Sequence, residues 1–187
     1  DSPEEVRVVV ANSQLAIKRN DFGAAVRMLS RVPKDSVAYT KAQLEKANIY
    51  LQHRNDRRRY INCYQSLVDQ AGTSASHIHL GEAYMRIQEP EKAIECFETA
   101  YRLDQSNGAL ATKIGVALVS THDYLKAIDY YETALRTSPD RNDLRHSLAE
   151  LYFKLNEFTR AIRVLDQTLG NVGADSDANA MKAEVAA

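Results

Sequence analysis

The sequence predicts an all-α solenoid built from about five helix-turn-helix repeats, and two observations support this prediction. Helix-breaking residues are scarce, with seven Gly and four Pro in 187 residues, while Ala, Leu, Glu, Lys and Arg are abundant. That composition favours helix throughout. Columns of apolar residues also recur every 34 residues, a repeat period that indicates stacked units rather than one globular core.

The period is clearest from residue 74 onward. Gly81 and Gly115 stand 34 residues apart, and each follows a large apolar residue. The columns in the same register are Leu80, Ile114 and Leu148; Tyr84, Leu118 and Tyr152; Ala93, Ala127 and Ala161; Phe97, Tyr131 and Leu165; and Ala100 and Ala134. Within each unit, apolar residues three and four apart predict two amphipathic helices joined by a short polar turn.

Small and large residues alternate in these columns. A Gly inside a helix costs about 0.5–1 kcal/mol relative to Ala, so Gly81 is expected where two backbones approach closely. Ala93 and Ala100 are expected at similar approaches, whereas Tyr84 and Phe97 are expected to fill gaps. A larger side chain in place of the glycine should cost about 1–3 kcal/mol.

The register divides residues 2–173 into five repeats, with expected bounds 2–36, 37–73, 74–107, 108–141 and 142–173. Residues 174–187 are expected to begin a further helix that the chain cuts short. Ser2-Pro3-Glu4-Glu5 predicts a capping box at the first helix, and Ser13 takes the small position there. In the second repeat, Tyr60, Tyr64 and Leu67 fit only if the turn within 52–58 holds one extra residue.

These motifs resemble the tetratricopeptide repeat. The order Leu80-Gly81-x-x-Tyr84, Ala93, Phe97 and Ala100 is similar to its consensus. The later repeats match through Ile114, Gly115, Ala127, Tyr131, Ala134 and Pro139, and then through Leu148, Tyr152, Ala161 and Leu165. The resemblance implies a right-handed solenoid whose units bury their apolar faces against their neighbours. It also implies a protein-binding scaffold rather than an enzyme.

A narrower resemblance rests on longer segments. Residues 41–52, 66–69, 80–95 (LGEAYMRIQEPEKAIE) and 113–135 are similar to the long tetratricopeptide subunits of intraflagellar transport complex A. Residues 87–89 and 121–124 carry this resemblance, because they lie outside the repeat code. It implies a scaffold in a large complex for retrograde ciliary transport and for assembly of the cilium or flagellum. The alternative is a free-standing peptide-binding adaptor or co-chaperone.

In the tetratricopeptide family the first helices line a concave groove, and the resemblance places candidate partner contacts on them. These candidates are Leu44, Asn48, Leu51, Ile78, Glu82, Met85, Arg86, Thr112, Val116, Val119, His146, Glu150 and Phe153. Exposed apolar residues mark contact surfaces for a helix or an extended segment. The alternative is that neighbouring repeats cover them or that they stay hydrated. A clamp for terminal carboxylates needs paired cations, which Leu44, Thr112 and Val116 do not provide beside Asn48.

Other candidate sites have simpler structural interpretations. The basic run 53–59 (HRNDRRR) is expected to be a solvated turn, because the interleaved aromatics and broad basic face of a nucleic-acid or lipid site are missing. His77 and His79 point to different sides of a helix and do not predict a metal site. Cys63 and Cys96 are expected beside core rings on second helices. No catalytic, phosphate-binding or metal motif occurs, so no cofactor or small-molecule substrate is expected.

Charge and hydropathy further restrict the kind of partner and the cellular location that we expect for this protein. The net charge of −1, with signs interleaved, gives no bulk attraction to nucleic acid or to an anionic membrane. No apolar run approaches the roughly 18 residues of a membrane span, and the two separated cysteines favour a reducing compartment. We therefore expect a cytoplasmic protein, at the cilium or flagellum and its base, whose partners are other subunits of a transport complex.

Overall fold

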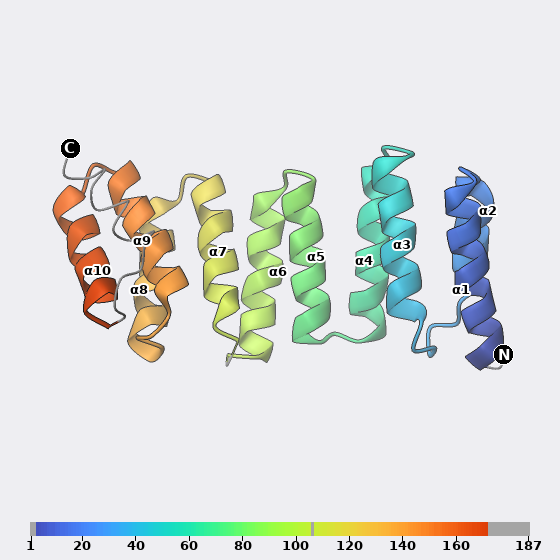
Figure 1. Cartoon of the computed structure of the whole chain (residues 1–187), viewed down its shortest axis with the longest axis horizontal. Helices are drawn as coiled ribbons and strands as arrows, with labels where there is room; N and C mark the ends of the chain where they lie inside the picture. Colours follow the sequence, from blue (N-terminus) through green and yellow to red (C-terminus); the bar gives the residue numbers. More distant parts are fainter. Residues whose placement is uncertain (1–2, 106, 172–187) are drawn as a thin grey trace. The chain divides into compact units, whose positions relative to one another are not determined.

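The computed structural model describes residues 3–105 and 107–171, with side chains described for 6–105 and 107–167. Throughout this part the regular elements are α-helices, confirming the all-α prediction (Figure 1). They are α1 (Pro3–Lys18), α2 (Phe22–Leu29), α3 (Tyr39–Gln52), α4 (Arg57–Gln70), α5 (Ser74–Arg86), α6 (Pro90–Leu103), α7 (Ala109–Ser120), α8 (Tyr124–Thr137), α9 (Asn142–Lys154) and α10 (Phe158–Asn171). Ser2 of the expected capping box and the expected helix at 174–187 lie outside the described residues.

The two helices of each pair are joined by a turn with a left-handed residue. These residues are Asn20, Asn55, Gln88, His122 and Asn156, with φ between 49° and 65°. The residue after it donates its backbone N–H into the last turn of the first helix, as Asp123 does to the Leu118 carbonyl at 2.9 Å. In three turns this residue is an aspartate (Asp21, Asp56 and Asp123) whose carboxylate caps the second helix. The turn thus ends one helix and starts the next.

The second repeat contains the extra turn residue that the sequence required. Four residues separate Gln52, the end of α3, from Arg57, the start of α4, whereas three separate α5 from α6. The Asp56 N–H accordingly reaches back six residues, to the Tyr50 carbonyl at 2.9 Å. The shift brings Tyr64 into register with Phe97, as predicted, and buries Tyr60 to 1% exposure.

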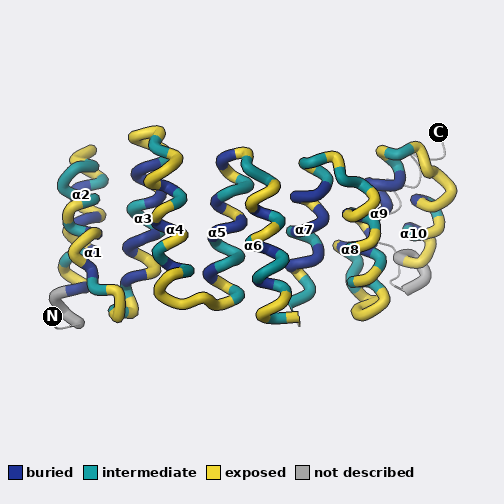
Figure 2. Tube along the Cα trace, turned by 180° about the vertical axis from the view of Figure 1, so that it is seen from behind, coloured by how far each residue is buried: buried dark blue, intermediate teal, exposed yellow. Residues whose placement is uncertain are grey.

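The helices group into two compact units, α1–α6 and α7–α10. Within each unit, every helix packs against the next one along the chain, and α7 also packs against α9. Buried residues lie on the helix faces turned toward neighbouring helices, while the turns and outer faces are exposed (Figure 2). Each unit is therefore stabilised by contacts between neighbouring helices.

The helical glycines Gly81 and Gly115 make room for aromatic rings of the following helix. A Cβ added to Gly81 would lie 2.5 Å from Cε1 of Phe97, and the three atoms nearest to it all belong to that ring. The expected close approach of two backbones at Gly81 is therefore wrong, because the aromatic side chain of α6 occupies that space. Ser13, at the same position of the first repeat, is fully buried, and its hydroxyl donates to the Val10 carbonyl at 2.7 Å.

Candidate functional site

The candidate contacts of unit 1 lie on α3 and α5, and none of them is buried. Leu44, Leu51, Ile78 and Met85 are half-buried, and the polar candidates Asn48, Glu82 and Arg86 are exposed. Glu82 lies 3.8 Å from Nδ1 of His79. The first helices of this unit therefore present apolar side chains between polar ones, a composition suited to contact with another protein.

A hollow of about 350 Å³ lies between α1 and α3 and includes one of these candidates, Asn48. Its wall also contains Gln14, Ile17, Lys18 and Glu45. The Gln14 amide donates to Oε1 of Glu45 at 2.9 Å, while Oε2 of Glu45 is buried without a hydrogen-bond partner in the described part of the chain. A buried acceptor left unpaired is costly, so an incoming N–H or O–H group would stabilise this site.

Three residues of this hollow were missed by the sequence analysis. Gln14, Ile17 and Lys18 stand 34 residues before Asn48, Leu51 and Gln52. Extending the 34-residue register into the first repeat identifies them. The signal was weak there because Ser13, rather than Gly or Ala, occupies the small position of that repeat.

The candidate contacts of unit 2 lie on α7 and α9. Thr112, Val119 and Phe153 are half-buried, whereas Val116, His146 and Glu150 are exposed, Val116 to 47%. Nε2 of His146 lies 4.0 Å from Oε1 of Glu150. The Phe153 ring packs edge-on against Phe158 of α10, with 5.6 Å between centroids, so it is held by its own unit as well as accessible to a partner.

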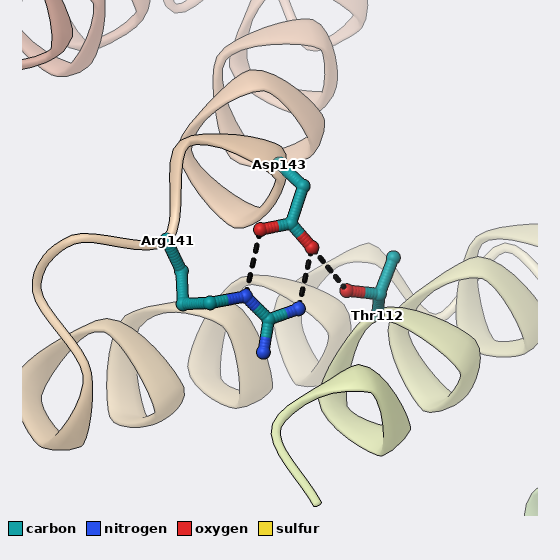
Figure 3. Close-up of polar contacts among 3 residues, drawn as sticks. All are labelled: Thr112, Arg141 and Asp143. Atoms are coloured by element: carbon teal, nitrogen blue, oxygen red, sulfur yellow. Dashed lines mark hydrogen bonds and ion pairs between the residues drawn. The ribbon is translucent and has the colours of Figure 1, made fainter. Parts of the chain in front are cut away.

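An ion pair at the start of α9 lies beside these candidates, and a hydrogen bond connects it to Thr112 of α7 (Figure 3). The guanidinium of Arg141 donates to both carboxylate oxygens of Asp143, at 2.7 and 2.5 Å, and the Thr112 hydroxyl donates to the same carboxylate at 3.5 Å. The hydrogen bond from Arg141 lowers the pKa of Asp143. A Cβ on Gly108 would clash with the Arg141 guanidinium, so the absence of a side chain there lets the arginine lie across the start of α7.

A second hollow, of about 630 Å³, lies between α8, α9 and α10, away from the candidate contacts. Arg136, Arg160 and Arg163 line its rim, and the Tyr152 hydroxyl donates to Glu132 within it at 2.8 Å. Burial and this hydrogen bond raise the pKa of Tyr152 to about 12. The buried hydroxyl is therefore a structural donor at neutral pH.

The basic run 53–59 is exposed apart from the half-buried Asp56, as expected for a solvated turn, and its last three residues begin α4. The guanidinium carbons of Arg54 and Arg59 lie 5.8 and 5.7 Å from the centroid of the Tyr50 ring. The His53 ring stacks on Phe22 of the preceding helix pair at 3.8 Å. No Phe, Tyr or Trp lies within the run itself, as the sequence indicates, but the rings of Tyr50 before it and of Phe22 on α2 contact its basic residues.

The described residues contain no cluster of three or more His, Cys, Asp and Glu side chains able to hold a metal ion. His77 and His79 are both half-buried on α5. Cys63 on α4 is buried and Cys96 on α6 is half-buried against the core, as expected. Burial raises the pKa of each thiol to about 11. Within the described helices, none is long and apolar enough to cross a membrane.

Comparison with known proteins accounts for this architecture. A tetratricopeptide repeat sequence model matches residues 74–107, the segment with the clearest consensus. The chain belongs to the tetratricopeptide repeat family. Two further models, described as the ARM repeat and the fourth ARM domain of tetratricopeptide repeat protein 21, match residues 1–67 and 110–187. The family membership predicted from the sequence is thus confirmed.

Relatives with similar sequences extend over most of the chain. It is 42% identical to tetratricopeptide repeat protein 21B of Mus musculus over 168 residues, which is 90% of this chain and 13% of the mouse protein. It is 41% identical to protein 21A of Mus musculus over 98% of this chain, and 34% identical to the Caenorhabditis elegans homolog over 87%. The chain spans only 12–14% of the length of these relatives. The narrower resemblance predicted from the sequence, to long tetratricopeptide proteins, is thus confirmed by relatives of 34–42% identity.

Solved structures share the fold. A tetratricopeptide repeat protein from Parabacteroides merdae superposes with a TM-score of 0.70 at 13% identity, covering 97% of this chain and 72% of that one. YrrB, described as a tetratricopeptide protein with an unusual peptide-binding site, superposes with a TM-score of 0.64 at 12% identity, covering 94% and 90%. At such low identity these likenesses show the all-α repeat fold alone.

Proposed function

We propose that this chain is a non-catalytic scaffold segment of an intraflagellar transport complex A subunit, acting in retrograde ciliary transport and cilium assembly. Its partners are the other subunits of that complex, in the cytoplasm and at the cilium or flagellum and its base. The observation that carries the proposal is the identity of about 40% to tetratricopeptide repeat proteins 21A and 21B over most of the chain. The partly exposed apolar side chains that lie between polar residues on α3 and α5 of unit 1, and on α7 and α9 of unit 2, supply a contact surface on each unit.

A direct binding measurement tests this role. The immobilised chain is incubated with the purified remaining subunits of intraflagellar transport complex A, and retained subunits are identified. Ile78→Asp and Val119→Asp place a charge on the candidate surface of unit 1 and of unit 2, and they should weaken retention without lowering helicity by circular dichroism. Leu125→Asp, on the second helix α8 at an 80% exposed position, is the control. Equal retention by all variants would show that the candidate contacts do not bind these subunits.

A second candidate function is a free-standing adaptor for peptides. The hollow between α1 and α3 favours it, because Oε2 of Glu45 is a buried acceptor without a partner in the described chain and Asn48 lies beside it. A peptide N–H donated to Glu45 would satisfy that oxygen. Capture of peptides that is lost in Glu45→Ala and in Asn48→Ala, together with no retention of complex A subunits, would replace the scaffold assignment with this one.

A further inference from the structure

Basic side chains meet where the first two turns of unit 1 come together. Nη1 of Arg27 and Nη2 of Arg54 lie 3.7 and 3.8 Å from the position that a Cβ on Gly23 would take. Arg54 and Arg59 share the Tyr50 ring. Arg57 and Arg58 are exposed at the start of α4, next to Arg59 in the chain. We call the arginines gathered at these turns, Arg27, Arg54, Arg57, Arg58 and Arg59, the arginine edge.

The charge of the arginine edge is only partly neutralised within the described chain. Residues 18–27 and 53–59 contain seven Lys and Arg against two Asp, although the whole chain has a net charge of −1. Both aspartates cap helices, since Asp21 accepts from the Ala24 N–H and Asp56 from the Arg59 N–H, each at 2.9 Å. Asp56 also pairs with Nε of Arg59 at 3.4 Å. Asp21 lies near Arg27 and Arg54, so one carboxylate stands beside two guanidinium groups.

Two of these arginines occupy positions that disfavour the helix to which they belong. Arg57 and Arg58 lie in the first turn of α4, where the positive end of the helix dipole repels cations. Arg59 has a structural role instead, because it pairs with Asp56 over the Tyr50 ring as Lys92 pairs with Glu89 over the Tyr84 ring. The repeat fold does not require Arg57 and Arg58, because α6 begins with Pro90 and Glu91. A local preference broken without a structural gain is expected at functional surfaces. Arg57 and Arg58 are thus better explained by a ligand than by folding.

We propose that the arginine edge binds an acidic segment of a partner protein through its Asp and Glu carboxylates. Guanidinium groups match carboxylates in a two-pronged geometry that lysine cannot reproduce, and the four Lys and Arg residues of 53–59 are all arginine. This inference rests on the proposed scaffold function and names the chemistry of one partner at a surface separate from the candidate contacts on α3 and α5.

Two other anionic partners fit the surface less well. Nucleic acid would need free rings for base stacking, but Tyr50 is only 9% exposed beneath its two arginines and Phe22 is stacked on His53. A membrane contact is strengthened by apolar side chains that enter the lipid. In the described part of the chain, the exposed large apolar side chains lie outside residues 18–27 and 53–59.

Binding of a short, labelled, carboxy-terminally amidated Glu-rich peptide to the chain tests the proposal by fluorescence anisotropy. The double variant Arg57→Glu/Arg58→Glu should weaken binding about tenfold or more. Its folding should be unaffected or improved, because acidic residues suit the first turn of a helix. The matched control, Arg31→Glu/Lys34→Glu, makes the same charge change at exposed positions before α3, and it should bind like the unmodified chain.

Equal affinity in the two double variants would overturn the proposal. So would binding to phosphatidylserine vesicles or to single-stranded DNA in place of the peptide. Amidation removes the terminal carboxylate, so capture by a carboxylate clamp at Asn48 cannot imitate the expected result. If the subunits of complex A are retained through α3 and α5 while the peptide does not bind, this inference fails and the proposed function stands.

Discussion

The ring of Tyr131 fills the space in which a side chain on Gly115 would lie. A Cβ on Gly115 would overlap Cε1 and Cζ of that ring, far inside van der Waals contact. The two residues come from α7 and α8 and are 16 positions apart, as are Gly81 and Phe97. Ala149 and Leu165 stand 16 apart in the last repeat as well, where they form a small buried cluster. In this last repeat the residue on α9 is larger, Ala in place of Gly, and its partner on α10 is smaller, Leu in place of Phe or Tyr.

We predict that Gly115→Ala destabilises unit 2 by about 1–3 kcal/mol, because the added methyl displaces the ring. This loss should outweigh the gain of about 0.5–1 kcal/mol that Ala has over Gly inside a helix. Gly23→Ala is the control, since a Cβ there meets its neighbours at 3.6–3.8 Å, and it should stabilise the protein by that helical gain. Chemical denaturation measures both changes.

Tyr131→Leu should couple to Gly115→Ala in a double-mutant cycle. The double variant would place alanine against leucine, as Ala149 is naturally placed against Leu165. It should therefore lose less stability than the two single losses added together. A coupling energy of about 0.5–3 kcal/mol is expected for residues in contact. Additive losses would show that the two positions do not share the same space.

The stability of unit 2 should fall in acid because of Asp143. Its folded pKa is lowered by Arg141, so the ion pair stabilises the fold above the ordinary Asp pKa of about 4 and is lost as pH falls through the lower folded value. The carboxylate is 52% exposed, which limits the effect to about 0.2–1 kcal/mol. Asp143→Asn should remove this part of the pH dependence, measured by denaturation at several pH values, and Asp140→Asn should leave it unchanged.

Both cysteines should react slowly while the protein is folded. Burial raises their pKa values to about 11, from the ordinary thiol value of 9.0. Their thiolate population at neutral pH is therefore about one hundredth of that of an unperturbed thiol. Alkylation by iodoacetamide should be about 100-fold slower than that of the denatured chain, with Cys96 reacting before the more deeply buried Cys63. Equal rates before and after denaturation would contradict this.

Gln88→Gly should stabilise unit 1 by up to about 1 kcal/mol, because the roughly 1–2 kcal/mol cost of a left-handed side-chain-bearing residue exceeds the roughly 0.5–1 kcal/mol entropy cost of glycine. Gln88 has a φ of 65°, a left-handed conformation in which a side chain is strained and glycine is not. Gln88→Val should destabilise the unit, because a β-branched residue adopts this conformation poorly. Thermal unfolding followed by circular dichroism distinguishes the two variants, and the same order for Gly and Val is expected at His122.

Much of the fold could be read from residue spacing. The 34-residue columns placed the helix pairs, and the offset of Tyr60, Tyr64 and Leu67 located the extra residue that the structure shows before Arg57. These inferences succeeded because helix formation and burial follow local apolar periodicity. The spacing of the left-handed turn residues, from Asn20 to Asn156, was equally present in the sequence as a recurring Asn, Gln or His before an acidic residue.

The sequence by itself determined which residues are helical, where the pairs turn and which faces are apolar. Only the tertiary structure decided that the glycines face rings rather than backbones, and that Phe22 and Tyr50 lie against His53, Arg54 and Arg59. The physical reason is that contacts between side chains distant in the sequence depend on packing directions and on how neighbouring turns meet. The local periodicity of apolar residues predicts neither the packing directions nor the contacts between turns.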